Sequence, residues 1–430
     1  MTRRFSDPLL STALFAALSA ATLGSSPAAA AETVVAPGQD TLQAAIEAAQ
    51  PGDILRLRPG VYRGAVLIDK ALRIDGTVGV EIEGPGTGTV ITVTAPDVVV
   101  SKLHVAGSGS SHETLDAGIK LTRTADRAVV RDSVSTGNLV GIDIHGAKDA
   151  IVSGNLVVGR TDFRMNDRGN GIYVWNAPGA VIENNTVRQG RDGIFVNTSA
   201  RNVIRGNRFE DLRFAVHYMY GREGEIAGNF SSGNHLGYAL MFSDRLTVRD
   251  NVSLDDRDYG IMLNYANSAE IEGNFVRGAD EKCLFMYNAN KNRLVGNRFE
   301  ACETGIHFTA GSDRNAIVGN AFIGNQTQVK YVGSRDLEWS EAGRGNYWSD
   351  HAAFDVNGDG IADSAYRPND IIDQVLWTQP SAKLLLGSPA VQLVRWSQSQ
   401  FPALLPGGIV DSAPLMVPVD LSATREGGRS

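Results

Sequence analysis

An asparagine recurs at a nearly constant interval through the middle of the chain, and this interval limits the folds that the chain can adopt. Each asparagine closes a segment of similar sequence, such as GIDIHGAKDAIVSGN (141–155). After a first step of 30 residues the asparagines lie 22 or 23 residues apart. They are Asn155, Asn185, Asn207, Asn229, Asn251, Asn274, Asn297 and Asn320. Such a repeat indicates one small structural unit that is stacked many times.

Each repeat predicts two or three short strands. Apolar and polar residues alternate over four to five positions, with Gly and Asn at the corners, and no ten-residue amphipathic stretch suggests a helix. Asn suits a corner because its side chain bonds to backbone and tolerates a left-handed conformation. A short strand cannot bury its apolar side alone, so each strand should pair with its copy one turn on, which gives an all-β parallel β-helix. The period and the missing Leu or Trp-Asp signatures disfavour leucine-rich and propeller repeats.

Different sequences flank the repeat. Residues 41–49 (TLQAAIEAA) predict a short helix that covers the first coil and protects the open edge of its sheets. The repeat is lost after about residue 335, and residues 388–401 predict an amphipathic helix with Ser and Pro at its start. Residues 404–418 are apolar and rich in proline. This C-terminal extension either caps the last coil, docks on a partner, or does both.

The N-terminus has the pattern of a secretory signal peptide. Arg3 and Arg4 precede an apolar stretch too short to span a bilayer, and small residues at 29–31 offer a cleavage site. We therefore expect a periplasmic mature protein that begins near Glu32. No later segment contains the roughly 18 uninterrupted apolar residues of a transmembrane helix, so the membrane should be reached only through a partner.

The chain thus divides into three parts: a signal peptide over 1–31, a β-helix domain over 32–335, and a C-terminal cap and docking region over 336–430. The net charge is −8 and the isoelectric point is near 5.5. Nucleic-acid binding normally needs a basic face, so a nucleic-acid partner is not expected.

Two cysteines, Cys283 and Cys302, occur in the chain. Export permits a disulfide, but two cysteines are no disulfide framework. Because the two residues occupy offset positions along the coil, we expect two buried free thiols.

The gapless alignment of the repeats also assigns directions to side chains. Because side chains alternate along a strand, Ile142 and Ile144 should point into the coil, and Asp143 and His145 should point out. The first outward column contains Asp143, Tyr173, Phe195, His217, Ala239, Met262, Phe285 and His307. The second contains His145, Trp175, Asn197, Met219, Met241, Asn264, Tyr287 and Thr309. Neighbouring strands lie about 4.8 Å apart.

This spacing brings His217, Met219, Met241 and Met262 together on outward positions of one face, and we expect His217 and Met219 to be exposed. Three of the seven methionines of the chain fall there. Imidazole and thioether groups favour copper, whereas zinc or calcium would favour thiolates or carboxylates. The four residues are therefore candidate ligands of a transient copper site that a partner completes. The alternative is an apolar patch that binds a partner's surface, because methionine suits adaptable interfaces.

A candidate calcium loop follows the repeats. DVNGDGIAD (355–363) places Asp355, Asn357, Asp359 and Asp363 at a spacing like the start of a calcium loop. The bidentate Glu expected at position 12 is missing, and an Asx-rich turn is the alternative interpretation.

A carbohydrate-active β-helix is the rival functional class. A glycosidase needs two or three carboxylates converging on one face, yet Asp143 is the single acid in the two columns. We therefore do not expect an enzyme. A carbohydrate-binding module would instead use exposed aromatic residues such as Tyr173, Trp175 and Phe195.

Four stretches of the chain resemble the NosD family. They are AVHYMYGREGEIAGN (215–229), GYALMFSDRLTVRDN (237–251), CLFMYNANKNRLVGNRFE (283–300) and RGNYWSDHAAFDVNGDGIADSAYRPND (344–370), and the resemblance covers roughly residues 32 to 420. It implies a right-handed parallel β-helix in the periplasm that assists maturation of nitrous oxide reductase (NosZ).

The resemblance also implies partners. They are an ABC transporter with the permease NosY and the ATPase NosF, the lipoprotein copper chaperone NosL, and the reductase whose copper centres are assembled. No ligand set is transferred from the family, so the copper ligands rest on the residues of the two columns.

Overall fold

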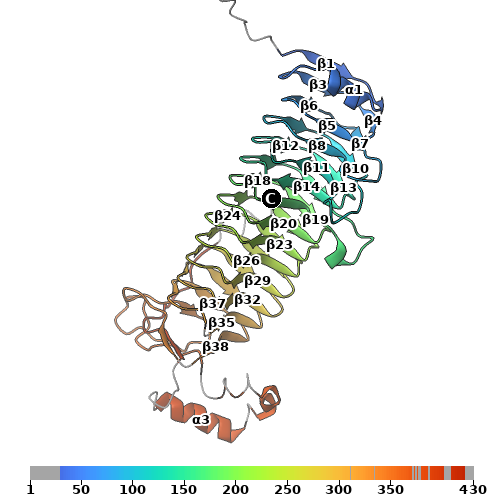
Figure 1. Cartoon of the computed structure of the whole chain (residues 1–430). Helices are drawn as coiled ribbons and strands as arrows, with labels where there is room; N and C mark the ends of the chain where they lie inside the picture. The colour runs from blue at the N-terminus through green and yellow to red at the C-terminus, as the bar shows by residue number, and fades with distance from the viewer. Residues whose placement is uncertain are drawn as a thin grey trace, which may run out of the picture.

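The computed structural model of the protein describes residues 30–309, 311–333, 335–369, 372, 375, 379–385, 388–400 and 408–421. The chain winds into an elongated solenoid whose turns stack along one axis, from the blue N-terminal turns to the orange C-terminal ones (Figure 1). Each regular turn contributes one strand to each of three parallel sheets, which contain 13, 14 and 12 strands. The prediction of an all-β parallel β-helix is confirmed.

The three sheets run the length of the solenoid. The 13-stranded sheet extends from β1 (Glu32–Val35) to β36 (Ala316–Val318), and the 14-stranded sheet from β2 (Gly38–Gln39) to β40 (Tyr347–Trp348). The 12-stranded sheet, called the third sheet below, carries the candidate site. Its strands are β5 (Val66–Ile68), β8 (Ile91–Val93), β11 (Ala117–Leu121), β14 (Val140–His145), β17 (Ile172–Trp175), β20 (Asp192–Asn197), β23 (Phe214–Met219), β26 (Leu236–Met241), β29 (Tyr259–Asn264), β32 (Lys282–Tyr287), β35 (Thr304–Thr309) and β38 (Thr327–Val332).

One continuous core fills the inside of the solenoid. Val196, Tyr218 and Leu240 pair on successive strands and are completely buried, as alternation along the strands predicts. The helix α1 (Thr41–Ala48) packs on the first turn and buries Leu42 and Ile46. It therefore covers the apolar end of the stack, which would otherwise be open to water and to edge-to-edge pairing.

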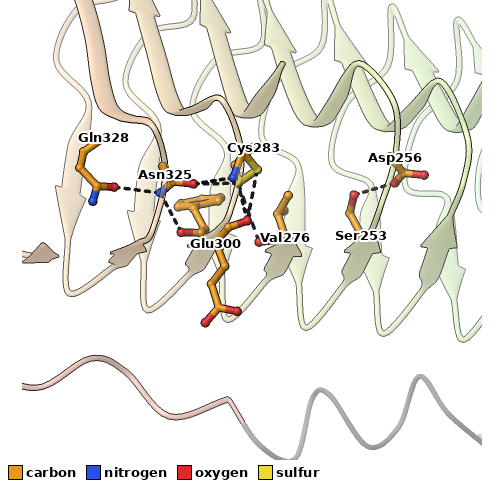
Figure 2. The surroundings of a disulfide bond; sticks show 9 residues. Ser253, Asp256, Val276, Cys283, Glu300, Asn325 and Gln328 are labelled. Carbon is orange, nitrogen blue, oxygen red and sulfur yellow. Dashed lines mark hydrogen bonds between the residues drawn. A yellow bond between two sulfur atoms is a disulfide. The ribbon is translucent and has the colours of Figure 1, made fainter. Parts of the chain in front are cut away.

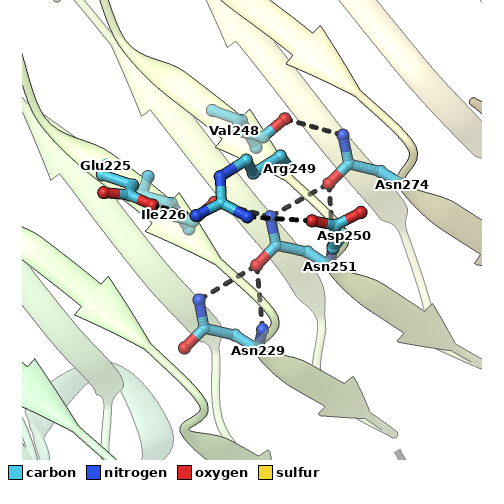
Figure 3. A network of polar contacts seen from close by, with 8 residues as sticks. All are labelled: Glu225, Ile226, Asn229, Val248, Arg249, Asp250, Asn251 and Asn274. Carbon is cyan, nitrogen blue, oxygen red and sulfur yellow. Dashed lines mark hydrogen bonds and ion pairs between the residues drawn. The ribbon is translucent and has the colours of Figure 1, made fainter. Parts of the chain in front are cut away.

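The recurring asparagines form a buried ladder of side-chain amides (Figure 3). Nδ2 of Asn229 donates to Oδ1 of Asn251 at 2.9 Å, and the backbone N of Asn229 donates to the same oxygen at 3.0 Å. Nδ2 of Asn251 also donates to the carbonyl of Ile226 at 2.8 Å. The side-chain amide of Asn251 is thereby satisfied on both sides, which fixes the register of neighbouring turns.

The same pattern joins all eight predicted asparagines and continues to Asn346. The ladder asparagines themselves do not adopt the left-handed conformation that their corner position suggests. The residue before each takes it instead, for example Gly228 with φ 61° and Asp250 with φ 56°. Asn is thus used here for its amide, because Oδ1 accepts from one turn while Nδ2 donates to the next.

The C-terminal part of the chain folds back over the last turn. β39 (Asp336–Glu338) pairs with β41 (Gly408–Val410), and Trp339, Trp348 and Ile409 are buried in the main core. Asp411 is buried and ends the amide ladder: it accepts from the backbone N of Asn346 at 2.7 Å and from Nε1 of Trp348 at 2.8 Å. Residues 336–369 and 408–421 therefore include the structural end of the solenoid.

The predicted amphipathic helix is α3 (Pro389–Gln400), which lies beyond the last turn (Figure 1). Its apolar residues Leu393 and Trp396 are 62% and 60% exposed. The structure also describes two short 3-10 helices, η1 (Met165–Asp167) and η2 (Pro380–Leu385). Residues 1–29, which contain almost all of the predicted signal peptide, lie outside the described residues. Among the described residues, no helix has the length and apolar character needed to cross a membrane.

Cys283 and Cys302 form a disulfide in the interior of the solenoid, so the prediction of two free thiols is wrong (Figure 2). Their separation of 19 residues is shorter than one repeat, which suggested offset positions. The corner before β35 brings the chain back toward the start of β32, and the two Cα atoms lie 5.7 Å apart, within the range of a disulfide. The bridge joins consecutive turns.

Candidate functional site

The outer face of the third sheet shows the two predicted columns. Strand pairing joins Phe195 to His217 and Met219 to Met241, and Ala239 pairs next with Met262. The four candidate copper ligands therefore lie on the three neighbouring strands β23, β26 and β29. Their place in the register agrees with the alignment of the repeats, whereas their roles stay a prediction.

A third column on the same face is missing from the prediction. Pairing joins its members in succession: Asp192, Phe214, Leu236, Tyr259 and Lys282. Each comes directly before the Gly, Ala or Cys at which the aligned segments begin. Extending every repeat by one residue toward the N-terminus would have included this column.

His217 is buried within this face, so the expectation of an exposed side chain is wrong. The residue is 8% exposed, and its ring stacks on Phe195 with ring centroids 4.4 Å apart. Nδ1 lies 3.1 Å from Oδ2 of Asp192 in the third column. Because a carboxylate accepts and does not donate, Nδ1 carries the proton. Nε2 is buried and has no hydrogen-bond partner, so this nitrogen is the one at which the ring could bind a metal ion.

Asp192 is completely buried and anchored by charge. Arg213 donates to it through Nε at 2.8 Å and through Nη2 at 2.7 Å. Burial alone raises the pKa of Asp192, but hydrogen bonds from His217 and Arg213 outweigh burial and lower the pKa below its usual value. The group is therefore a carboxylate at neutral pH. A carboxylate that fixes one nitrogen of a histidine is a common support for metal ligation through the other nitrogen.

The methionines are packed to different degrees. Met219 and Met241 are half-buried, so the expectation of a fully exposed Met219 is wrong, and Met262 is 9% exposed. Met262 is buried because it belongs to a small apolar cluster outside the main core, against which larger side chains of neighbouring turns pack. The cluster consists of Leu236, Ala239 and Met262, with Phe214, Met241, Tyr259 and Phe285 packed against it.

These groups suit a soft, singly charged metal ion. Nε2 of His217 and the thioethers of Met219 and Met241 are neutral donors of the kind that Cu(I) accepts. Within the part of the chain that the structure describes, no three or more His, Cys, Asp or Glu side chains gather into a metal site. Copper bound by His217, Met219 and Met241 would have two thioethers and one imidazole as its ligands from this chain.

His307 ends the first column and is separated from the methionines by Phe285. It pairs with Phe285 on one side and with Lys330 on the other. Burial, together with the positive charges of Lys330 and Lys282, lowers the pKa of His307 to about 4. The ring is therefore neutral at physiological pH.

The two acids of the outward columns are both neutralised. Asp143 is fully buried, and one of its oxygens lies 3.2 Å from Nζ of Lys120. Asp192 is held by Arg213 as described. A glycosidase instead presents two carboxylates to its substrate at a defined separation.

The candidate calcium residues lie in one exposed loop, and their oxygens accept backbone N–H groups. Asp355 accepts from Gly358 at 2.7 Å and from Gly360 at 2.8 Å, and Asp363 accepts from Val356 at 2.6 Å. Hydrogen bonds from the backbone, with that of Gly360 the strongest, lower the pKa of Asp355. This geometry matches the alternative Asx-rich turn. Calcium binding by Asp355, Asn357, Asp359 and Asp363 stays a prediction.

Comparison with solved structures shows the fold. A mannuronan C-5 epimerase module, AlgE6 from Azotobacter vinelandii, matches with a TM-score of 0.51 and 15% identity over 69% of this chain and 93% of its own. An exopolygalacturonase from Thermotoga maritima matches with a TM-score of 0.50 and 10% identity over 66% of this chain and 84% of its own. At these identities the likeness concerns the β-helix alone.

Sequence comparison is more specific. The family model described as "Periplasmic copper-binding protein (NosD)" matches residues 153–353. A relative from Stutzerimonas stutzeri, named "Probable ABC transporter binding protein NosD", is 41% identical over 84% of this chain and 86% of its own length. A relative of the same name from Pseudomonas aeruginosa is 40% identical over 84% of this chain and 87% of its own. The matched region contains the outer face with His217 and the methionines, and the chain belongs to the NosD family.

Proposed function

We propose that this protein is a periplasmic accessory protein for assembly of the copper centres of nitrous oxide reductase. It receives copper from a lipoprotein chaperone of the NosL type and works with an ABC transporter formed by a NosY permease and a NosF ATPase. Membership of a family described as periplasmic and copper-binding supports this proposal, as do the relatives named as ABC transporter binding proteins.

The observation that carries the copper role is the state of His217. Asp192 fixes its Nδ1, and the unpartnered Nε2 lies on the same face as the thioethers of Met219 and Met241. A buried polar atom without a partner is costly, and a soft metal bound there offsets the cost. Because the donors are few and neutral, copper binds with moderate affinity and leaves when a partner offers further ligands.

The exposed apolar side chains of η2 and α3 form the proposed contact with the permease. Leu384 and Leu385 of η2 and Leu393 of α3 are 92%, 59% and 62% exposed. Exposed apolar side chains gathered in one segment are typical of a contact with a partner. This contact lies at the opposite end of the solenoid from α1 and leaves the outer face of the third sheet open.

The test is replacement of Met219 and Met241 together by leucine. A Met-to-Leu exchange conserves volume and costs less than about 1.5 kcal/mol of folding stability, whereas it removes both sulfur ligands. The Cu(I) affinity, measured by competition with a chromogenic chelator, should fall roughly tenfold or more. The copper content of the reductase produced in cells carrying the variant should fall as well.

Met286→Leu is the matched control, because Met286 is an equally exchangeable thioether that points into the core. Unchanged copper affinity and a fully loaded reductase in the Met219→Leu/Met241→Leu variant would show that the methionines form only an apolar interaction patch.

A further inference from the structure

A stack of exposed aromatic rings borders the candidate copper face. Tyr220 stacks on Phe242 with centroids 5.2 Å apart, and Phe242 stacks on Tyr265 at 5.1 Å. The three residues are 52%, 39% and 42% exposed. Tyr220 directly follows Met219, and Phe242 directly follows Met241. The rings therefore continue the column of methionines around the edge of the third sheet.

The backbone at these positions is unfavourable for the residues that occupy it. Tyr220, Phe242 and Tyr265 have φ angles of 53°, 47° and 51°, in the left-handed region that bulky side chains avoid. The same corner of the neighbouring turns is also left-handed and carries Asn176, Thr198 and Asn288. Aromatic residues thus replace small polar ones on three consecutive turns, beside the methionines. Local backbone preference does not explain them, and their exposure shows that core packing does not either.

A groove of about 520 Å³ runs alongside the stack. Tyr220 and Phe242 form part of its wall, and its charged lining consists of Arg201, Arg222 and Asp244. Its charged groups therefore sum to a positive charge, although the whole chain carries −8. Exposed Tyr and Phe next to Arg and Met is the composition of protein–protein contact surfaces.

We infer that this edge is the docking surface for the NosL-type chaperone that passes copper to Met219 and Met241. The surface is formed by Tyr220, Phe242, Tyr265 and the adjacent groove. The inference rests on the proposed function and names where that partner sits. The fitting partner presents an apolar ridge to the rings and carboxylates to Arg201 and Arg222. Seated there, it brings its own metal ligands to the half-buried thioethers, which lie one residue away along the chain.

The proposed surface can be tested without harming the fold. Asn stands at the equivalent corner in other turns, so Tyr220→Asn and Phe242→Asn place a residue that tolerates left-handed backbone. The double variant should unfold at the same temperature as the wild type or at a higher one. Ala301→Asn, at an exposed left-handed position of another corner, is the control for a general effect of asparagine.

Two measurements on the mature full-length chain separate docking from copper binding. The first is Cu(I) uptake from a small-molecule chelator, and the second is association with a Cu(I)-loaded soluble form of the NosL-type chaperone. We expect wild-type uptake from the chelator in the Tyr220→Asn/Phe242→Asn variant, with association roughly tenfold weaker or worse. Arg222→Gln should also weaken association, and added salt should reduce that difference.

The outcomes distinguish the two proposals. Association of the double variant with wild-type affinity overturns the docking surface, and so does ring-dependent binding of a neutral oligosaccharide with chaperone association unaffected. A wild-type chain that takes no copper from the chelator, yet binds the chaperone through the rings, removes the proposed copper role and leaves the docking surface in place.

Discussion

Asp256 is a buried acid at a corner where the preceding turn carries an amide. Asn234 donates its backbone N to Oδ1 of Asp256 at 2.9 Å, as in the amide ladder, and Ser231 donates to Oδ2 at 2.7 Å. Ser253 donates to the same Oδ2 at 2.6 Å (Figure 2). Burial raises the pKa of Asp256 from 3.8 to about 6, although these hydrogen bonds oppose the rise. Folding therefore favours the uncharged form of Asp256 more than the unfolded chain does.

The pKa shift of Asp256 sets how its contribution to the folding free energy changes with pH. A folded-state pKa about two above the unfolded value corresponds to roughly 3 kcal/mol of folding free energy. Because the folded-state pKa is the higher one, this contribution is present below pH 3.8 and is lost as the pH rises through about 6. Asp256→Asn keeps an acceptor for Asn234 and never ionises. It should therefore stabilise the protein at pH 7.5 by up to roughly 3 kcal/mol relative to the wild type.

The assay is thermal unfolding, followed by circular dichroism between pH 4 and pH 8. The variant should unfold at a temperature several degrees higher than the wild type at pH 8, and the difference should shrink toward pH 4. Asp255→Asn is the matched control, since Asp255 is the exposed neighbour and its left-handed backbone accepts Asn. A difference between Asp256→Asn and the wild type that stays constant across this range would refute the assignment of a raised pKa.

Four further results follow from the structure. Asp192→Asn should lower the Cu(I) affinity roughly 10–100-fold, measured by chelator competition, because His217 loses the group that fixes its Nδ1; unchanged affinity in a folded variant would exclude His217 as a supported ligand. Asn251→Ala should cost roughly 2–5 kcal/mol in chemical unfolding, because it leaves buried amide groups of both neighbouring turns without a partner. Replacement of Cys283 and Cys302 by Ala should cost roughly 3 kcal/mol, as expected for a loop of this length, and equal stability of the reduced and oxidised wild type would contradict it. Replacing residues 389–400 by a flexible linker should leave the unfolding temperature unchanged and abolish co-purification with the permease, whereas retained co-purification would place the contact elsewhere.

The repeat made the fold predictable because every regular turn has the same local pattern. The interval between asparagines fixed the length of a turn, and alternation fixed the inward side chains. Pairs within one column, such as Met219 with Met241, followed directly from a gapless alignment. These features are local or strictly periodic, so the sequence displays them without any knowledge of tertiary contacts.

The surroundings of the candidate site could not be predicted in the same way. The Asp192–His217 contact joins residues 25 positions apart, which is three more than one repeat of 22, so the column alignment does not pair them. Burial of Met262 depends on the ring sizes of Tyr259 and Phe285 on neighbouring strands. The disulfide joins cysteines 19 residues apart, which is less than one repeat, and depends on how the corner before β35 is folded. Each of these is set by side-chain geometry between turns, which a pattern along the chain does not contain.

Asp411 makes closure of the solenoid depend on a residue near the C-terminal end of the described chain. The chain is synthesised from its N-terminus, so every regular turn is made before the residue that closes the stack. The backbone N–H of Asn346, the last residue of the ladder, has its acceptor 65 residues later in the chain, in Asp411. A chain that stops anywhere in between leaves the backbone N–H of Asn346 and Nε1 of Trp348 without their carboxylate acceptor. Only a chain that extends as far as Asp411 supplies this acceptor, so a shorter product leaves the last turn of its stack incomplete.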